Sequence, residues 1–386
     1  MSLSDAIKYV GVDDLETDFF EGQYPIPDGI SYNSYVIMDD KITIMDSVDA
    51  VKTEEWLKNL DAVLGDQKPE YLVISHMEPD HSGSLLAVAH KYPDMKLVGN
   101  AKTFAFAKGL LDDDFAGRQI VVKEGDTLEL GSHTLQFVFA PMVHWPEVMF
   151  SYEQSEKILF TADGFGKFGA WSKTDGTKDW LDEARRYYIN IVGKYGMQVN
   201  NVLKKAAALE IQTICPLHGP ILEENLSYYL ERYQTWASYT PEEKGVLIAV
   251  ASAHGNTHQA ALEMEKVLKE KNIPVHVCDL VRDGLSEAVG LAFKYETCIF
   301  AAPTYDAGIF LPMLDFIQHL KSKNYQNRRA AFIENGTWAP ASAKLMTEQL
   351  STCKNVTFCE NKVSIRSSVK ANNLEEMKAL AEEIQG

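Results

Sequence analysis

The sequence of 386 residues has few cysteines and no pair of them in a metal-binding spacing. The five thiols belong to Cys215, Cys278, Cys298, Cys353 and Cys359, and none of them forms a C-x-x-C motif. This excludes an iron–sulfur or rubredoxin-like module built on cysteines within the chain. We expect the five to be reduced structural thiols. If the protein uses electrons, another molecule must supply them.

Positive charge and long apolar runs are also scarce. Lys and Arg number 37 against 55 Asp and Glu, which gives a formal net charge of -18. A charge of this sign argues against binding to nucleic-acid phosphates. No run approaches the roughly twenty apolar residues that a membrane helix requires. The opening residues M-S-L-S-D-A-I-K lack the basic start and apolar core of a signal peptide. We therefore expect a cytoplasmic protein that binds neither nucleic acid nor membranes.

The length and the hydrophobic content of 46% predict two globular domains. The first part of the chain alternates short strands and helices, such as a strand over Thr134–Phe139 and helices over Thr53–Leu64 and Lys178–Val192. Around Tyr233–Lys244 the sequence loses the hydrophobic periodicity that is typical of a buried helix or strand. We therefore predict one domain over residues 1–240 and a second over residues 241–386.

The second domain has a regular strand–helix rhythm. Gly245–Ala251 and Cys298–Ala302 are continuous apolar strands, and Thr257–Lys271 is an amphipathic helix between them. Continuous apolar strands separated by helices indicate a parallel sheet covered on both faces. This rhythm over about 140 residues predicts a flavodoxin-like, doubly wound α/β fold.

Four residues capable of binding a metal follow one buried strand of the first domain. His76, Glu78, Asp80 and His81 stand in S-H-M-E-P-D-H-S-G-S, directly after the apolar run Tyr71–Ile74. In an extended segment, residues two apart share a face, and the proline and glycine of this motif allow the backbone to turn. The four side chains can therefore point toward two nearby places, an arrangement that suits a two-metal site. The alternative is an ordinary polar loop at a strand end.

Three further candidate ligands occupy the same kind of position. His144, Asp163 and His218 each lie just beyond a predicted strand and before a proline or glycine turn. Strand ends in an α/β sandwich lie along one rim, so these loops can meet the first four residues. Any one of them alone would more often be an ordinary loop residue, but the same placement recurs four times.

Several fragments, in this order, resemble the metallo-β-lactamase fold: G-I-S-Y-N-S-Y-V-I, H-M-E-P-D-H, E-G-D-T-L-E-L-G, H-W-P-E-V-M, the Asp163 loop and P-L-H-G-P. Most hydrolases of that superfamily have His where Glu78 stands. The glutamate and the His144-Trp145-Pro146 sequence resemble the flavodiiron proteins, also called A-type flavoproteins. The resemblance covers nearly the whole chain. It implies an N-terminal αββα sandwich followed by a flavodoxin-like sheet.

The resemblance also implies a diiron site. His76, Glu78 and His144 would hold one iron, Asp80, His81 and His218 the other, and Asp163 would bridge them. Mixed carboxylate and imidazole ligands suit iron, whereas imidazole-rich tetrahedral sites favour zinc. Two ferrous ions carry four positive charges, and the three carboxylates supply three negative ones. A bridging hydroxide would neutralise the cluster.

The loop after the first strand of the second domain has the character of an anion site. Small and polar residues precede a helix there: Ser252, His254, Gly255, Asn256 and Thr257. Such a loop presents backbone N–H groups to an anion. It lacks the Lys of a Walker A loop and the three-glycine dinucleotide pattern, so ATP and NAD fit poorly. It resembles the FMN phosphate loop of flavodoxins.

Two more loops follow strands of the same predicted sheet. They contain Pro303, Thr304, Tyr305, Asp306 and Gly308 in one and Asn335, Gly336, Thr337 and Trp338 in the other. Ligands of open α/β sheets bind at the carboxyl ends of the strands. The two aromatic residues suit stacking on a flavin ring. Taken singly, each could equally be an exposed or core-edge aromatic.

The family resemblance implies an oxidoreductase that reduces O2 to water or NO to N2O, with electrons passed through FMN from an external donor. A rubredoxin or a reduced deazaflavin is the expected donor. A head-to-tail homodimer, or a dimer of such dimers, would bring the flavin of one subunit to the irons of another. The alternatives are a zinc-dependent hydrolase with an attached flavin domain and a simple electron carrier.

Overall fold

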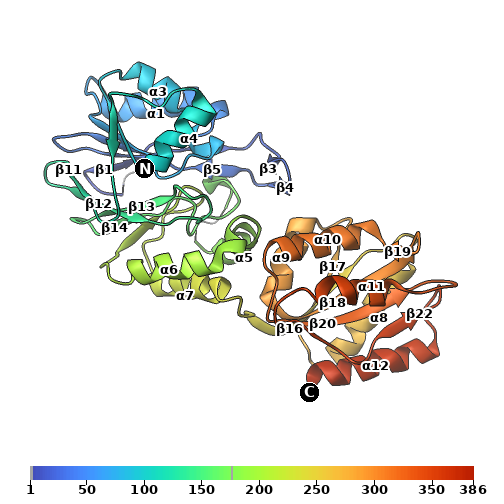
Figure 1. Cartoon of the computed structure of the whole chain (residues 1–386). Helices are drawn as coiled ribbons and strands as arrows, with labels where there is room; N and C mark the ends of the chain where they lie inside the picture. Colours follow the sequence, from blue (N-terminus) through green and yellow to red (C-terminus); the bar gives the residue numbers. More distant parts are fainter. Residues whose placement is uncertain (1–2, 175–176) are drawn as a thin grey trace. The chain divides into compact units, whose positions relative to one another are not determined.

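The computed structural model describes residues 3–174 and 177–386, which form two compact units (Figure 1). The first unit comprises Met1–Tyr188 and Tyr195–Gln234, and the second comprises Ile189–Lys194 and Thr235–Gly386. The predicted division at residue 240, with one function on each side, stays a prediction.

Two sheets form the centre of the first unit. The first sheet has the order β1 (Ile7–Tyr9), β6 (Tyr35–Ile37), β7 (Thr43–Met45), β8 (Tyr71–Val73), β9 (Lys96–Gly99) and β10 (Gln119–Val121). The second has the order β11 (Thr127–Glu129), β12 (Thr134–Phe139), β13 (Met149–Glu153), β14 (Ile158–Phe160) and β15 (Thr213–Cys215). Strands β7 to β10 run parallel, as do β14 and β15. The carboxyl ends of β8, β14 and β15 each lead into a candidate ligand loop.

Helices cover the outer faces of both sheets. They are α1 (Thr53–Leu64), α3 (Leu85–Lys91), α4 (Ala101–Leu111), α5 (Trp180–Tyr187), α6 (Gly196–Ala206) and α7 (Leu226–Ala237), while the short α2 (Pro79–Ser82) belongs to the turn after β8. Figure 1 shows α1, α3 and α4 beyond the first sheet and α5, α6 and α7 beyond the second. Buried residues of both sheets, such as Tyr35, Val73, Phe137 and Phe160, form one core between them. The predicted αββα sandwich is confirmed.

The second unit contains one sheet with the order β17 (Val275–Asp279), β16 (Glu243–Val250), β18 (Tyr295–Tyr305), β20 (Arg329–Asn335) and β21 (Thr357–Phe358). Strand β22 (Val363–Ile365) pairs in parallel with β20, and β19 (Gly308–Ile309) forms a hairpin with β18. The pairs β16–β17, β16–β18 and β18–β20 are all parallel. The first strand lies between the second and the third, which is the flavodoxin-like order. This part of the predicted fold class is confirmed as well.

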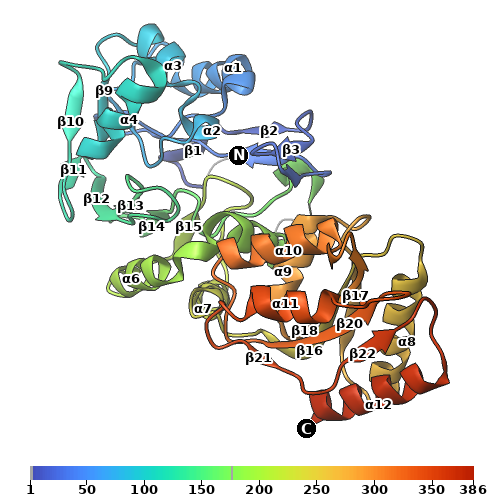
Figure 2. The same ribbon diagram turned by 45° about the vertical axis from the view of Figure 1, so that its right-hand side comes forward.

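Helices lie on both faces of this sheet (Figure 2). Helices α8 (Asn256–Glu270) and α12 (Ala371–Gln385) pack on one face through a core of small and aliphatic side chains. Helices α9 (Leu285–Lys294), α10 (Leu311–Ser322) and α11 (Ser342–Leu350) cover the other. Strand β16 is buried from Gly245 to Val250, which explains its uninterrupted apolar sequence.

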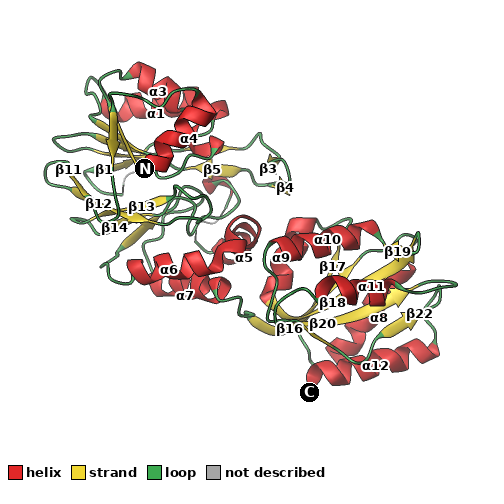
Figure 3. Ribbon diagram, in the orientation of Figure 1, coloured by secondary structure: helices red, strands yellow, loops and turns green. Residues whose placement is uncertain are grey.

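Some elements differ from the predictions (Figure 3). The helix predicted over Lys178–Val192 is α5 followed by a π-helix over Tyr188–Val192. Helix α6 was not predicted, because it begins at Gly196 and buries only small or β-branched side chains in addition to that glycine. Four short strands near the N-terminus were also not predicted: β2 (Val12–Asp14), β3 (Phe19–Phe20), β4 (Tyr24–Pro25) and β5 (Ile30–Tyr32). Within residues 3–174 and 177–386, no helix has both the length and the apolar character needed to cross a bilayer.

Candidate functional site

Four of the seven candidate metal ligands come from the turn after β8. His76 and Glu78 lie in this turn, and α2 starts immediately after it, with Pro79 at its first position. Proline suits that position because its fixed φ matches a helix and its missing N–H has no helical partner there. The short helix carries Asp80 and His81 back toward the same point.

The tight turn depends on a glycine at the end of α2. A Cβ atom added to Gly83 would lie 2.6 Å from the backbone nitrogen of Ala50. Real Cβ atoms do not approach other atoms so closely, so the backbone of α2 can lie against residues 48–50 only with glycine there. Ser47 Oγ fixes the same helix by donating a hydrogen bond to the carbonyl of His81 at 2.5 Å.

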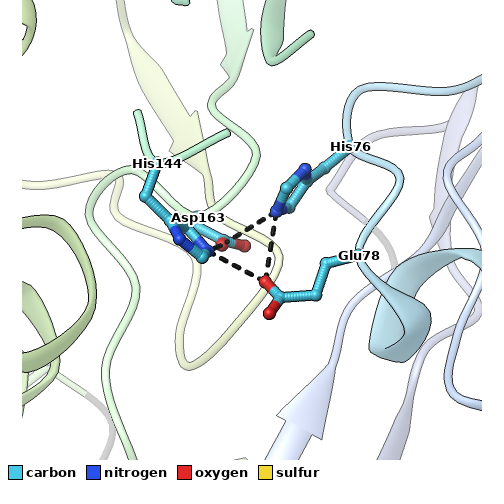
Figure 4. A group of neighbouring side chains, drawn as sticks. All are labelled: His76, Glu78, His144 and Asp163. Carbon is cyan, nitrogen blue, oxygen red and sulfur yellow. Dashed lines mark hydrogen bonds and ion pairs between the residues drawn. The ribbon is translucent and has the colours of Figure 1, made fainter. Parts of the chain in front are cut away.

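The other three candidates come from loops that follow strands, as predicted. His144 lies between β12 and β13, Asp163 follows β14, and His218 follows β15. The structure brings all seven side chains together in two groups. Figure 4 shows four of them converging from three loops.

The first group contains His76, Glu78, His144 and Asp163. One oxygen of Glu78, Oε2, lies 3.2 Å from His76 Nε2 and 2.8 Å from His144 Nε2. Oδ2 of Asp163 lies 3.5 Å and 3.2 Å from the same two nitrogens. Two imidazole nitrogens and two carboxylate oxygens therefore face a common point (Figure 4).

The second group contains Asp80, His81 and His218. Oδ2 of Asp80 lies 3.2 Å from His81 Nε2 and 3.3 Å from His218 Nε2, and the two Nε2 atoms are 3.1 Å apart. The other oxygen of Asp163, Oδ1, lies 3.2 Å from His81 Nε2 and 3.7 Å from His218 Nε2. Asp163 thus presents one oxygen to each group, which is the geometry of a bridging carboxylate.

Two hydrogen bonds outside the groups orient the imidazoles. His76 Nδ1 lies 2.7 Å from Glu147 Oε1, which also accepts a hydrogen bond from the Met77 backbone. His218 Nδ1 lies 2.8 Å from the carbonyl of Ser31. A carbonyl can only accept, so Nδ1 of His218 must carry the proton and its Nε2 has a free lone pair. Contacts of this kind select the tautomer that binds a metal.

Glu147 was not among the predicted site residues. It is fully buried, and its oxygen Oε2 has no hydrogen-bond partner in the described part of the chain. The sequence contains one signal for it, an acidic residue three positions after His144 in H-W-P-E. That spacing does not reveal that the carboxylate turns toward His76, because the contact joins two different loops.

The burial and chemistry of the site fit a pair of divalent cations. All seven residues are less than a tenth exposed, and neither oxygen of Asp80 has a hydrogen-bond donor among the described residues. Burial, reinforced by the neighbouring Glu78 carboxylate, raises the pKa of Asp80 to about 7. Buried carboxylates without donors cost free energy unless a cation compensates them. The mixed nitrogen and oxygen donors suit iron.

The second unit contains a cavity of about 690 Å³ at the carboxyl ends of β16, β18 and β20. Its volume lies in the usual range for cofactor sites. All three predicted loops line it, through Ser252, His254, Asn256, Thr257, Pro303, Thr304, Tyr305, Asp306, Asn335, Gly336, Thr337 and Trp338. The structure therefore brings these loops together around a single cavity.

Gly255 and Gly308, which were also predicted as contacts, do not line the cavity. Gly255 has a φ of 87° and donates a hydrogen bond to Ser252 Oγ at 3.0 Å, so it makes the turn that starts α8. Gly308 pairs with Tyr305 in the β18–β19 hairpin. Both glycines shape the loops, and their neighbours supply the surface.

A fourth loop also lines the cavity and was not predicted. Ser367 follows β22 and is held by Asn335, which donates to its carbonyl at 3.0 Å and accepts from its backbone nitrogen at 3.1 Å. Ser367 Oγ and Thr337 Oγ1 share a hydrogen bond of 2.9 Å. The rule that ligands bind beyond parallel strands would have found this loop if β22 had been recognised as a strand.

The two predicted aromatic residues are exposed at the cavity. Tyr305 is 51% and Trp338 86% exposed, and the Tyr305 ring packs against Phe310 at 5.4 Å. No Lys or Arg is found among the described residues that line the cavity. An anionic group there would be bound by hydroxyls and by the backbone N–H groups at the start of α8.

Comparisons with known proteins find one family model that matches the first unit and relatives that match the chain over both units. The ODP family beta lactamase model matches residues 30–219, which include all seven candidate ligands. The nitric oxide reductase of Moorella thermoacetica is 29% identical over 92% of this chain and 90% of its own length.

Two solved structures are similar over almost their whole length. The rubredoxin oxygen:oxidoreductase from the anaerobe Desulfovibrio gigas has a TM-score of 0.92 and 25% identity, over 100% of this chain and 97% of that chain. The flavodiiron protein from Giardia intestinalis has a TM-score of 0.91 and 24% identity, over 99% and 95%. Each similarity therefore extends over both units.

Proposed function

We propose that this chain is a flavodiiron protein, an oxidoreductase that reduces O2 to water, NO to N2O and water, or both. The observation that carries the proposal is the presence of a buried seven-residue ligand group and a cavity of flavin size on one chain. Reduction of one O2 to two waters consumes four electrons and four protons. Reduction of two NO to N2O and one water consumes two of each.

The first unit would hold two iron ions. His76, Glu78 and His144 would bind one and Asp80, His81 and His218 the other, with Asp163 shared between them. The 2.8 to 3.7 Å distances between facing ligand atoms are consistent with side chains that turn toward a common cation. When bound, the ferrous pair supplies open coordination positions for the gas, and FMN supplies electrons one at a time.

The residues of this chain orient the ligands and exclude water. Glu147 and the Ser31 carbonyl keep the Nε2 atoms of His76 and His218 directed into the site. Aromatic rings enclose the second group, with Phe20 and Tyr187 centred 5.5 and 5.4 Å from the His218 ring. A dry and preorganised site strengthens the electrostatic interactions within it.

The second unit would hold FMN. The phosphate would lie at Ser252, Asn256 and Thr257, where the N-terminus of α8 faces the cavity. Tyr305 and Trp338 supply aromatic surface for the isoalloxazine ring. Because no Lys or Arg lines the described cavity, phosphate recognition would rest on neutral hydrogen-bond donors. The flavodoxin phosphate loop, which the sequence of this loop resembles, binds FMN in the same way.

The electron donor would be a separate protein or cofactor. The chain has no C-x-x-C pair that could hold an iron centre of the rubredoxin type. A relative that is 27% identical over 98% of this chain is named rubredoxin-oxygen oxidoreductase. We take a rubredoxin as the first candidate and a reduced deazaflavin as the second.

We also propose a head-to-tail homodimer, alone or paired into a tetramer. The ligand group belongs to one compact unit and the flavin cavity to the other. A dimer in which the flavin unit of one subunit meets the ligand group of its partner would give electrons a short path. Full activity in a monomer would contradict this arrangement.

Metal and flavin analysis combined with gas assays tests the proposal. Purified protein is expected to contain two irons and one FMN per chain. After anaerobic reduction, separate additions of O2 and NO should reoxidise it and yield water or N2O. Zinc in place of iron, together with esterase or thiolesterase turnover, would overturn the proposal in favour of the hydrolase alternative.

A further inference from the structure

Asn33 lies in the short loop between β5 and β6, and both the nitrogen and the oxygen of its side-chain amide form hydrogen bonds. The residue is completely buried. Its Nδ2 donates hydrogen bonds to the carbonyls of Pro216 and Gly219, both at 2.8 Å. Its Oδ1 accepts from the hydroxyl of Tyr9 at 2.9 Å, and its backbone nitrogen donates to the carbonyl of Leu217 at 2.8 Å.

These three carbonyls surround His218 on the chain. Pro216 and Leu217 precede the histidine and Gly219 follows it, so Asn33 fixes the backbone on both sides of the imidazole. The neighbouring Ser31 accepts from His218 Nδ1 at 2.8 Å and thereby fixes the ring. A segment of three residues, Ser31–Asn33, thus determines where His218 Nε2 points.

The local backbone explains why a side chain is needed for this task. Gly219 has a φ of 78°, and a Cβ atom there would lie 2.5 Å from Cγ of Lys167. The chain therefore turns sharply directly after His218, and among the described residues no backbone N–H pairs with the carbonyls of Pro216 and Gly219. An Asn amide supplies two N–H donors from one nitrogen, whereas Asp supplies none.

We propose that Asn33 is a positioning residue for the second metal of the pair, acting through the loop that carries His218. The inference rests on the proposed diiron function. Asn33 makes no contact with His76, Glu78 or His144 among the hydrogen bonds of the described residues. Its loss is therefore expected to weaken metal binding at Asp80, His81 and His218 selectively. The G-I-S-Y-N-S-Y fragment thereby gains a physical role.

The test uses Asn33→Asp in the full chain. The carboxylate keeps the shape of the amide but places oxygen against the carbonyls of Pro216 and Gly219. Metal-free protein with FMN bound is titrated anaerobically with Co²⁺, and the visible ligand-field absorption is recorded. Wild-type protein should bind two Co²⁺ per chain. The variant should bind the first as wild type does and the second about 10- to 100-fold more weakly, the usual range for an outer partner of a metal ligand.

A matched control separates positioning from general destabilisation. Asn59 also donates to two backbone carbonyls in the same unit, those of Val10 at 3.3 Å and Gly11 at 3.1 Å. Asn59→Asp should lower the melting temperature and leave both Co²⁺ affinities unchanged. If Asn33→Asp does not fold, Tyr9→Phe removes only the hydroxyl that orients the amide and should weaken the second Co²⁺ alone by several fold.

The outcomes are distinguishable. A wild-type protein that binds fewer than two Co²⁺ would refute the diiron proposal itself. Two Co²⁺ with unchanged affinities in both Asn33→Asp and Tyr9→Phe would overturn the role of Asn33 and leave the diiron proposal standing. Equal weakening of both Co²⁺ affinities would also overturn it, because that result indicates a general effect on the unit.

Discussion

Glu147 is not itself an expected metal ligand, but it orients the side chain of a residue that is, His76. It accepts from both the His76 ring and the Met77 backbone, at 2.7 and 2.9 Å. The second contact fixes the carboxylate, and the fixed carboxylate then fixes the ring. A histidine held in this way presents the same nitrogen to every ion that enters, which is why such partners matter for affinity.

Glu147→Gln is therefore expected to lower metal affinity about tenfold, and Glu147→Leu about 100-fold. Glutamine can still accept a hydrogen bond from Nδ1 but lacks the negative charge, whereas leucine leaves the buried Nδ1 unpaired. Iron retained after dialysis against a graded series of chelator concentrations measures the effect.

Glu153→Gln is the matched control for this change. Glu153 is also fully buried in the first unit, but it accepts from the backbones of Ser155 and Glu156 and not from a candidate ligand. Its replacement should leave iron retention at the wild-type level. Equal loss of iron in both variants would show that burial of the carboxylate, and not its contact with His76, matters.

At the residue scale the sequence was most informative about ligands and least informative about their supports. Chemical type and position at a strand end were enough to propose His76, Asp163 and His218. Glu147, Asn33 and Ser367 support a site through contacts between distant loops, and no local pattern encodes such a contact. Asparagine in particular is common in turns for local reasons, so its presence in S-Y-N-S-Y does not by itself indicate a long-range role.

At the scale of elements, one histidine joins three turns of the first unit. His133, in the turn between β11 and β12, lies 2.7 Å from Asp39 in the β6–β7 turn and 3.2 Å from Glu156 in the β13–β14 turn. Burial opposes the charged imidazole, but the hydrogen bonds to both carboxylates outweigh it and raise the pKa of His133.

His133→Asn should destabilise the protein in a pH-dependent way. A raised pKa means that the charged interaction is fully present below the unfolded value of about 6.5 and is lost as pH rises through the folded value. The cost should be about 1 kcal/mol or less near pH 5.5, since solvent screens the partly exposed pair, and smaller near pH 8. Melting temperatures of both proteins across this range measure it. A difference that grows with pH would contradict the prediction.

Asn335 has a similar joining role in the second unit. It connects the end of β20 to Ser367 through two hydrogen bonds and lies 3.4 Å from Thr257 Oγ1 of the phosphate loop. Asn335→Ala should therefore loosen three sides of the cavity at once. We expect about a tenfold loss of FMN affinity, equivalent to 1.4 kcal/mol, measured by quenching of flavin fluorescence.

Asn373→Ala is the control for the loss of FMN affinity. Asn373 is equally buried in the second unit and also donates to a backbone carbonyl, that of Ser364 at 3.0 Å, but it does not line the cavity. Its replacement should lower stability without changing the FMN affinity. A comparable loss of FMN in both variants would remove any special role for Asn335.

The elements themselves were predictable where one local pattern dominated. Helix α1 buries Trp56, Leu60 and Leu64 four residues apart, and its predicted bounds match the structure. Strand β12 likewise has its predicted bounds. Helix α6 was missed although Val199, Val202 and Ala206 follow helical spacing, because its buried side chains are few and small and it begins at a glycine. The order of strands in the sheets follows from pairings across long crossovers, which periodicity within a segment does not specify.

For the molecule as a whole, the separate cores predict separate responses to loss of each cofactor. The ligand group lies within the first unit and the flavin cavity within the second. Ligands stabilise only the folded state to which they bind. Chelation of the metals should therefore lower the unfolding temperature of one calorimetric transition, and removal of FMN that of another. A single transition that moves under both treatments would contradict independent cores.

The burial of the ligand group also limits the size of the molecules that can reach it. Its most accessible members, Glu78, Asp80 and His144, are only 8%, 7% and 9% exposed. Burial of this degree favours access by diatomic molecules over access by an ester, a lactam ring or a nucleotide, each of which needs an open groove beside the metals. Selection by size would thus precede any selection by reactivity.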